Sequence, residues 1–369
     1  MTGARDMAGI GVPFAAGVAA GAFFFSRGCP SPVLFPGIMA AGIFLSAIHI
    51  FTCFKSSRRS VAVPFRIALL FCMAGVFCSL NSIMSSGITI PPGPLERLCT
   101  RSCENLRACI ESIPFPSSGT GPLVKALITG DRSGLDSATV SVFRASGASH
   151  ILALSGLHLG VIYLILAKAL SPLGNSPGAR KVKYSLIVGL SGFYTMMTGA
   201  SPSIIRAFLF IFINETGKLL CRERDPLRIL LAALTIQLAL KPDVIATTGF
   251  QLSYLAVLGI CTLFPFLDSI YPEGEWSRMD PFRKIWRAAA LSISCQVFTA
   301  PLVWIRFRTF PRYFLITNLI ALPLTSAVMV LSVATIALSY FGICPDVLII
   351  LDDKAVCLLT DCLEIISTM

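Results

Sequence analysis

Charge and histidine are scarce in this chain. Charged residues make up 13% of its 369 residues and there are only three histidines, whereas a soluble domain carries roughly 25% charged residues. This excludes an ordinary soluble enzyme. Hydrophobic residues instead reach 55%, with a mean hydropathy of +0.78. The composition predicts an all-α polytopic membrane protein, a helical bundle of about 8–11 transmembrane or re-entrant helices.

Several cofactor signatures are also missing. There is no CxxC zinc pattern and no GxxxxGK[ST] phosphate loop, so the sequence predicts no metal, no ATP site and no cofactor. Most of the 13 cysteines lie in apolar runs, where cysteine acts as a small hydrophobic residue. Cys99, Cys103 and Cys109 lie in a polar segment instead. One disulfide is possible there if that segment faces an oxidising compartment.

Apolar runs divide the chain into three regions. Residues 1–83 form an N-terminal group of three spans, 84–149 an external polar segment, and 150–369 a multi-pass membrane domain. We expect Leu227–Leu240 to be interfacial or re-entrant because it is short. We expect Tyr313–Tyr340 to be broken or kinked at Pro323. The candidate spans are Ile10–Phe25, Pro36–Phe54, Pro64–Ser82, Ile151–Leu170, Tyr184–Thr198, Ile204–Leu220, Leu227–Leu240, Phe250–Leu267, Trp286–Ile305, Tyr313–Tyr340 and Val347–Ile366.

Basic loop residues orient these spans, because cytoplasmic loops carry an excess of lysine and arginine. The basic cluster within 55–66 therefore predicts a cytoplasmic loop, which places 84–149 outside. A second basic cluster at 180–183 agrees with this orientation. Arg306 and Arg308 do not fit simple alternation. Either Leu227–Leu240 does not cross the membrane, or these arginines line something other than lipid.

The polar segment contains its own helical pattern. Residues 94–113 place apolar side chains at helical spacing between charges, which predicts an amphipathic helix on the outer membrane surface. Its apolar face is expected to contain Leu95, Leu98, Leu106, Cys109 and Ile113. Residues 114–122 read as a loop and 123–145 as helix, turn, helix. Asp131, Asp136 or Ser137 is expected to cap the second of these helices.

Residues 143–162 hold the most informative polar groups. His150, Ser155 and His158 enter an apolar helix there. Polar groups in hydrocarbon are costly unless they are partnered, so they mark functional sites more often than polar groups elsewhere. Ser155 and His158 lie three residues apart, on one helix face. They could be the nucleophile and base of a membrane-embedded hydrolase. A structural or gating contact and a direct ligand contact are the two alternatives.

Other polar residues lie inside apolar runs. Arg206 follows the turn Gly199–Ser203, so it either extends to lipid headgroups or faces an anion at a helix N-terminus. The embedded amides and the tyrosine either bond between helices or line a conduit. These further candidates are Gln251, Tyr254, Gln296 and Asn318.

Four ordered blocks of sequence resemble a known family. LITGDRSGLDSATVSVFRASGASHILALSGLHLG is followed by GASPSIIRAF, by KPDVIATTGFQLSYLAVLGI, and by QVFTAPLVWIRF with LITNLIALPL. Over roughly residues 125–325 this order is similar to the competence domain of ComEC-type DNA-uptake channels. The resemblance implies a multi-pass protein of the inner (plasma) membrane that passes single-stranded DNA into the cytoplasm during transformation. It also implies partners: a DNA receptor, a helicase-type motor and a separate nuclease.

A DNA path would need basic groups for phosphates and aromatic surfaces for bases. The basic candidates are Arg144, Arg206, Arg306, Arg308 and Arg312, and the aromatic ones are Phe143, Tyr254, Trp304 and Phe307. Members of the family often carry an external β-domain and a zinc nuclease domain with an HxHxDH motif. The polar segment is too short for the first, and the three histidines cannot form the second. We therefore expect no enzyme activity, and keep a hydrolase or a truncated remnant without transport as alternatives.

Overall fold

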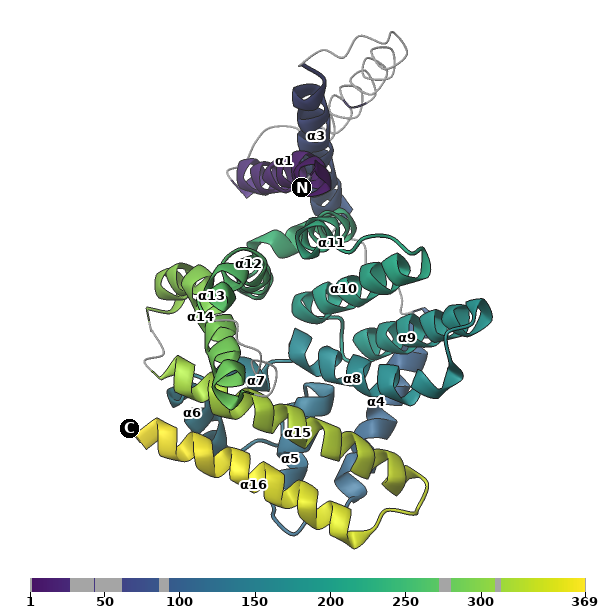
Figure 1. Cartoon of the computed structure of the whole chain (residues 1–369), viewed down its shortest axis with the longest axis vertical. Helices are drawn as coiled ribbons and strands as arrows, with labels where there is room; N and C mark the ends of the chain where they lie inside the picture. The colour runs from purple at the N-terminus through teal and green to yellow at the C-terminus, as the bar shows by residue number, and fades with distance from the viewer. Residues whose placement is uncertain are drawn as a thin grey trace. The chain divides into compact units, whose positions relative to one another are not determined.

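The computed structural model describes residues 2–26, 43, 62–85, 93–271, 280–308 and 313–368. Within these ranges every regular element is a helix (Figure 1), which confirms the predicted all-α class. The predicted span Pro36–Phe54 lies outside the described residues except for Ile43. The basic cluster that oriented the chain lies largely outside them too, as does Arg312.

The helices belong to two compact units. The first unit comprises Met1–Pro91 and Leu220–Leu258, and the second comprises Pro92–Leu219 and Gly259–Met369. The first contains α1 (Thr2–Ser26), α3 (Ala62–Ser85), α11 (Pro226–Leu240), the short 3-10 helix η2 (Pro242–Ala246) and most of α12 (Thr248–Thr262). The second contains α4 (Pro94–Ser112), α5 (Thr120–Thr129), α6 (Ser137–Ala145), α7 (Ser149–Leu152), α8 (Gly156–Ala169), the 3-10 helix η1 (Ser171–Leu173), α9 (Pro177–Met197), α10 (Pro202–Leu219), α13 (Phe264–Ser269), α14 (Pro281–Phe307), α15 (Phe314–Tyr340) and α16 (Asp346–Thr368). The three-part division read from the sequence concerns membrane topology, and it stays a prediction.

Membrane-crossing potential is concentrated in part of the helices. In the described ranges, four segments are long and apolar enough to cross a bilayer: Asp6–Phe23, Thr248–Ser269, Phe282–Phe307 and Phe314–Tyr340. Shorter apolar helices cover Ile67–Ile83, Gly156–Ala169 and Pro226–Leu240. The chain is thus a membrane protein, and a total of 8–11 crossings stays a prediction. The predicted span Val347–Ile366 is not among the four, because α16 places several acidic residues within its apolar sequence.

Two predicted spans are built differently from expectation. Ile151–Leu170 is not one helix: α7 ends at Leu152, Ala153 is extended, and α8 begins anew at Gly156. The opposite holds for α15, which continues through Pro323 as one helix of 27 residues, so the predicted break is wrong and a kink there stays a prediction. Apolar helices tolerate an internal proline when neighbouring helices and side chains compensate for the lost backbone bond.

In the first unit, α1 and α3 cross at glycines. A Cβ atom on Gly17 would overlap the backbone carbonyl of Cys72, and one on Gly75 would overlap that of Phe14. The two backbones therefore touch directly, as small residues permit between membrane helices. α11 also contacts α1, where a Cβ atom on Gly11 would lie 3.0 Å from Thr235 Oγ1.

The core of the second unit joins α5, α15 and α16, and α4 packs onto it. Leu127, Met329 and Leu359 are fully buried in one cluster with Ile110 of α4. The predicted helix at 94–113 is confirmed as α4, but its predicted apolar face is partly wrong. Leu95 and Leu98 are exposed, whereas Cys99, Cys103 and Ile110 are buried. Because α4 packs against α5, α9 and α15, protein and not lipid covers its buried side.

An acidic residue of α16 holds the start of α5. The Asp353 carboxylate accepts hydrogen bonds from Ser117 N–H (3.1 Å), Ser117 Oγ (2.9 Å) and Thr120 Oγ1 (2.5 Å). The first turn of a helix has N–H groups without helical partners and attracts negative charge. Asp353 bonds the preceding loop and the hydroxyl of Thr120, so it ties this helix start to α16 and places a negative charge beside it. By contrast, Asp136 occupies the N-cap position of α6, as predicted, but forms no side-chain cap hydrogen bond.

Candidate functional site at the turn before helix α8

Three non-helical residues, 153–155, separate α7 from α8, and we call them the Ser155 turn. Ser155 is the N-cap of α8: its Oγ accepts a hydrogen bond from Leu157 N–H at 3.3 Å. His158 returns the contact, because its Nδ1 accepts the Ser155 backbone N–H at 3.2 Å. Together they form a capping box, in which histidine takes the place that Glu or Gln usually occupies. The Ser-x-x-His spacing therefore encodes a helix start.

The same contact fixes the protonation of His158. An Nδ1 atom that accepts a backbone N–H must carry a lone pair, so the ring is neutral with its proton on Nε2. The ring is fully buried, and Ser155 Oγ lies 3.0 Å from Nδ1. Among the described residues, Nε2 has no hydrogen-bond partner. A catalytic pair would need a third group that orients the base. The described residues place no carboxylate on this nitrogen.

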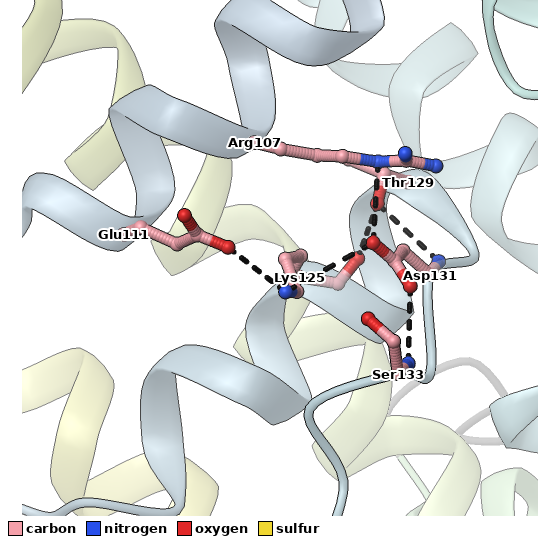
Figure 2. Close-up of polar contacts among 6 residues, drawn as sticks. All are labelled: Arg107, Glu111, Lys125, Thr129, Asp131 and Ser133. Atoms are coloured by element: carbon pink, nitrogen blue, oxygen red, sulfur yellow. Dashed lines mark hydrogen bonds and ion pairs between the residues drawn. The ribbon is translucent and has the colours of Figure 1, made fainter.

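The loop that follows α5 holds the Ser155 turn in position. Asp131 receives the Ser133 backbone N–H at 3.0 Å and pairs with Arg107 of α4 at 3.5 Å and Lys125 of α5 at 3.9 Å. Figure 2 shows these side chains converging, with Lys125 also bound to Glu111 at 2.9 Å. The Ser133 hydrogen bond, helped by the two cations, lowers the pKa of the Asp131 carboxyl. The carboxylate form therefore holds this loop against two helices.

The next residue of the loop carries that restraint to the turn. Arg132 donates from Nε to the backbone carbonyl of Leu152, the last residue of α7, at 3.0 Å. Gly130 makes the close approach possible: its φ is +78°, and a Cβ atom there would lie 2.8 Å from Leu154 Cγ. Gly130, Asp131 and Arg132 thus each have a separate role in positioning one turn.

Arg206 lies against the first residue of α8. A Cβ atom on Gly156 would lie 3.2 Å from Arg206 Nη2 and 3.4 Å from the Cβ of Ala207. Only glycine leaves full space for the guanidinium at this helix N-terminus. Arg206 is also close enough to Cys295 of α14 to act on it electrostatically. Arg206 of α10 therefore lies beside the start of α8 and within electrostatic reach of α14.

A tight turn sets the position of Arg206. After α9, Gly199 and Ala200 both have positive φ, +82° and +47°. Ala200 N–H bonds back to the carbonyl of Thr195 at 2.9 Å, and Gly199 N–H bonds to that of Met196 at 3.1 Å. Alanine in this left-handed region costs roughly 1–2 kcal/mol. The chain therefore reverses within a few residues, and α10 begins at Pro202.

The remaining candidates fall in different places. His150 is exposed, with Nδ1 3.2 Å from the carbonyl of Gly147. In the first unit, Gln251 donates to the carbonyl of Ile245 at 2.8 Å, and Tyr254 donates to Gln237 of α11 at 2.9 Å. These two side chains serve local and interhelical bonding.

Of the others, all in the second unit, Gln296 and Asn318 are half-buried on α14 and α15. Arg306 and Arg308 are exposed at the end of α14, beside exposed Trp304 and Phe307. Phe143 is fully buried and offers no face for stacking on a base.

The sequence reading missed the loop at 130–132 as a positioning device. Asp131 was predicted only as a possible helix cap, and no role was predicted for Gly130 or Arg132. The signal was present: a glycine directly after an apolar helix is typical of a left-handed helix end, and Asp-Arg follows it at once. Within the described ranges, no three of His, Cys, Asp and Glu lie close enough to hold a metal ion.

Comparison with known proteins gives a consistent result. The sequence model of the family "Competence protein" matches residues 127–369. ComE operon protein 3 of Bacillus subtilis (strain 168) is 27% identical over 210 residues, which cover 57% of this chain and 25% of that protein. The protein YcaI of Escherichia coli (strain K12), described as uncharacterized, is 23% identical over 221 residues, or 59% of this chain and 28% of that protein.

A third similar protein comes from Aquifex aeolicus (strain VF5) and is also described as uncharacterized. It is 32% identical over 122 residues, 32% of this chain and 27% of that protein. The matched part of this chain thus spans about a quarter of the length of these relatives. No solved structure matches the chain.

Proposed function

Because this chain belongs to the family of competence proteins, we propose that it forms an inner-membrane passage for one strand of DNA during transformation. The family match begins at Leu127, just before the loop that fastens the Ser155 turn. The Ser155 turn, its loop at 130–132 and Arg206 therefore lie within the part of the chain that matches the family. A strand of DNA must be guided by its phosphates, since these are the groups that every nucleotide shares.

The contact between Arg206 and the start of α8 is the observation that carries this proposal. The N-terminus of a helix is equivalent to roughly half a positive charge. The Arg206 guanidinium, 3.2 Å from the Cβ position of Gly156, brings a full charge to the same place. Two positive groups side by side favour an anion between or beside them, and guanidinium matches phosphate with two parallel hydrogen bonds.

Replacing Arg206 tests this role. We expect Arg206→Gln to lower the uptake of labelled single strands about 10-fold or more, because a hydrogen bond to a charged group contributes about 1.5–3 kcal/mol. Arg206→Lys should restore only part of the loss, because lysine keeps the charge but not the paired hydrogen bonds. Uptake is measured in transformable cells and normalised to the amount of protein in the membrane.

Arg224→Gln is the matched control, because it removes one charge from an exposed loop position. It should leave uptake near the wild-type level. If the Arg206→Gln variant takes up DNA as well as wild type, Arg206 does not contact phosphate. If lysine serves as well as arginine, the side chain only needs a charge, as it would at a lipid headgroup.

Partners and energy follow from the same proposal. We propose that a DNA receptor delivers the strand, that a helicase-type motor draws it inward and that a separate nuclease removes the other strand. The chain has no phosphate loop with which to use ATP. Movement of DNA therefore requires one of these partners or a gradient across the membrane.

The alternative of a Ser/His hydrolase is less well supported. The 3.0 Å contact between Ser155 Oγ and His158 Nδ1 would suit a nucleophile and a base. The capping box already explains that contact, however, and the His158 ring is fully buried. We infer that this pair shapes the start of α8 and carries out no bond cleavage.

A further inference from the structure

Two neighbouring acids of α16 have opposite environments. Asp353 receives three hydrogen bonds from the start of α5. Asp352 is fully buried, and one hydrogen bond reaches it, from Ser332 Oγ of α15 to Oδ1 at 3.0 Å. Its other oxygen, Oδ2, has no hydrogen-bond partner among the described residues. Helix α16 therefore holds one carboxyl group that the fold fully uses and one that it does not.

The surroundings of Asp352 are polar only on the side of α15. Thr335, also fully buried, lies close enough to act on the carboxyl group, although its hydroxyl makes no hydrogen bond of ordinary geometry within the described residues. Together with Ser332, it surrounds the carboxyl with two hydroxyl groups. A buried hydroxyl that stays unpaired is costly. An apolar side chain would fill the core without that cost, so these hydroxyl groups do more than occupy space.

No cation balances the buried carboxyl in the described part of the chain. Helix α15 carries no charged residue, α5 carries only Lys125, which is paired with Glu111 and Asp131, and α6 carries only Arg144, which is exposed. Lys354, two residues after Asp352 on α16, is exposed as well. The charged neighbour that acts on Asp352 is Asp353, which repels it.

We propose that Asp352 is a proton-binding site enclosed between α15 and α16. Burying an isolated carboxylate is strongly unfavourable, whereas a neutral carboxyl group can donate from one oxygen and accept at the other. With a proton on Oδ2, the carboxyl group can donate a hydrogen bond to Thr335 Oγ1, while Oδ1 still accepts the bond from Ser332. The proton comes from water and returns to water, so no other reactant is needed.

Electrostatics agrees with this geometry. Burial, together with the neighbouring Asp353 carboxylate, raises the pKa of Asp352 to about 6, although the Ser332 and Thr335 hydroxyls lower it in part. The site would then exchange its proton over a pH range in which an exposed aspartate remains ionised. If the chain conducts DNA as proposed above, this gives it a group that responds to a pH difference across the membrane. The proton site itself does not depend on that function.

Infrared spectroscopy of the purified full chain in lipid nanodiscs tests the proposal directly. A protonated carboxyl group has a carbonyl band that a carboxylate lacks. We expect a difference band, wild type minus Asp352→Asn, that appears as the pH falls through about 6. Asp361→Asn, at an exposed position of the same helix, should keep the band. Identical spectra of wild type and Asp352→Asn at all pH values above about 5 would overturn the proposal.

Two further measurements test whether the site binds a metal cation and whether Asp352 is the protonated group. If sodium but not potassium, at equal ionic strength, moves the band to lower pH, the site binds a metal cation and the proposal fails. The second measurement labels the wild-type chain with a hydrophobic carbodiimide. The proton of the carboxyl group moves to a nitrogen of the carbodiimide, and the carboxyl oxygen adds to the central carbon of the carbodiimide. Rearrangement leaves a stable acylurea for mass spectrometry. Asp352 should be modified increasingly as pH falls, and modification of Asp361 alone would contradict the site.

Discussion

Gly130 offers the sharpest test of how the Ser155 turn is held. Its φ of +78° lies in the left-handed region, where a side chain costs roughly 1–2 kcal/mol. A Cβ atom would also overlap the side chain of Leu154, and such overpacking costs typically about 1–3 kcal/mol. Gly130→Ala should therefore destabilise the second unit by about 2–5 kcal/mol.

The assay can use the chain's own thiols. Cys99 and Cys103 are free and buried in the second unit, so a thiol-reactive dye reports its unfolding in detergent. A destabilisation of 1 kcal/mol moves the melting temperature of a domain of 150–250 residues by about 2–4 °C. We thus expect the Gly130→Ala variant to melt on the order of 10 °C lower than wild type.

Two further variants separate the strain from the overlap. Gly342 follows α15 with a φ of +70°, and nothing lies within 4 Å of its Cβ position. Ile343 N–H bonds back to the carbonyl of Leu338 at 3.1 Å, which is typical of a left-handed helix end, so Gly342→Ala reports backbone strain alone and should lower melting by only a few degrees. Adding Leu154→Ala to Gly130→Ala should cost less than the sum of the single changes, because the overlap is gone. If Gly130→Ala melts no lower than Gly342→Ala, Leu154 does not pack on Gly130 as described.

Three further predictions concern the same part of the chain. Ser155→Ala removes a helix cap and should lower the free energy of unfolding by about 0.5–2 kcal/mol, with DNA uptake largely kept. His158→Gln should preserve the capping box. Complete loss of uptake by a folded Ser155→Ala variant would support the hydrolase. The Ser133 hydrogen bond lowers the pKa of Asp131. The ionised Asp131 therefore contributes fully to stability above the unfolded-state pKa of about 3.9, and this contribution is lost as pH falls through the lower folded-state pKa. The melting temperature of Asp131→Asn should vary less with acid pH than that of wild type. A cysteine at Ser118, in a background without other reactive thiols, should react with a membrane-impermeant reagent applied outside the cell; protection there would reverse the predicted orientation.

Periodicity predicted most helices because it depends on local spacing. Apolar spacing alone placed α4, α9, α10 and α11 to within a few residues, apart from the start of α9. The side that α4 buries was harder to predict. The same apolar pattern suits lipid or protein, and only the packing of α5, α9 and α15 decides that Cys103 is covered while Leu98 is not.

The candidate site shows the same limit. Ser155 and His158 were found because polar groups are rare in apolar helices, and their spacing places them together. The contact of Arg206 with Gly156 joins residues 50 positions apart in sequence, and no local rule predicts it. The environment of Asp352 is equally non-local: its sequence neighbour Asp353 has the same chemistry, yet only tertiary contacts distinguish the two.

The glycine crossing of α1 and α3 has a consequence for the order of biosynthesis. Both helices leave the ribosome early, but α11, which packs against α1 at Gly11, lies more than a hundred residues later. At bacterial synthesis rates of about 5–20 residues per second, the gap lasts on the order of ten seconds. During that interval lipid or the insertion machinery must cover the face that α11 will occupy. Backbone contact at Gly17 and Gly75 lets the early pair persist through this delay.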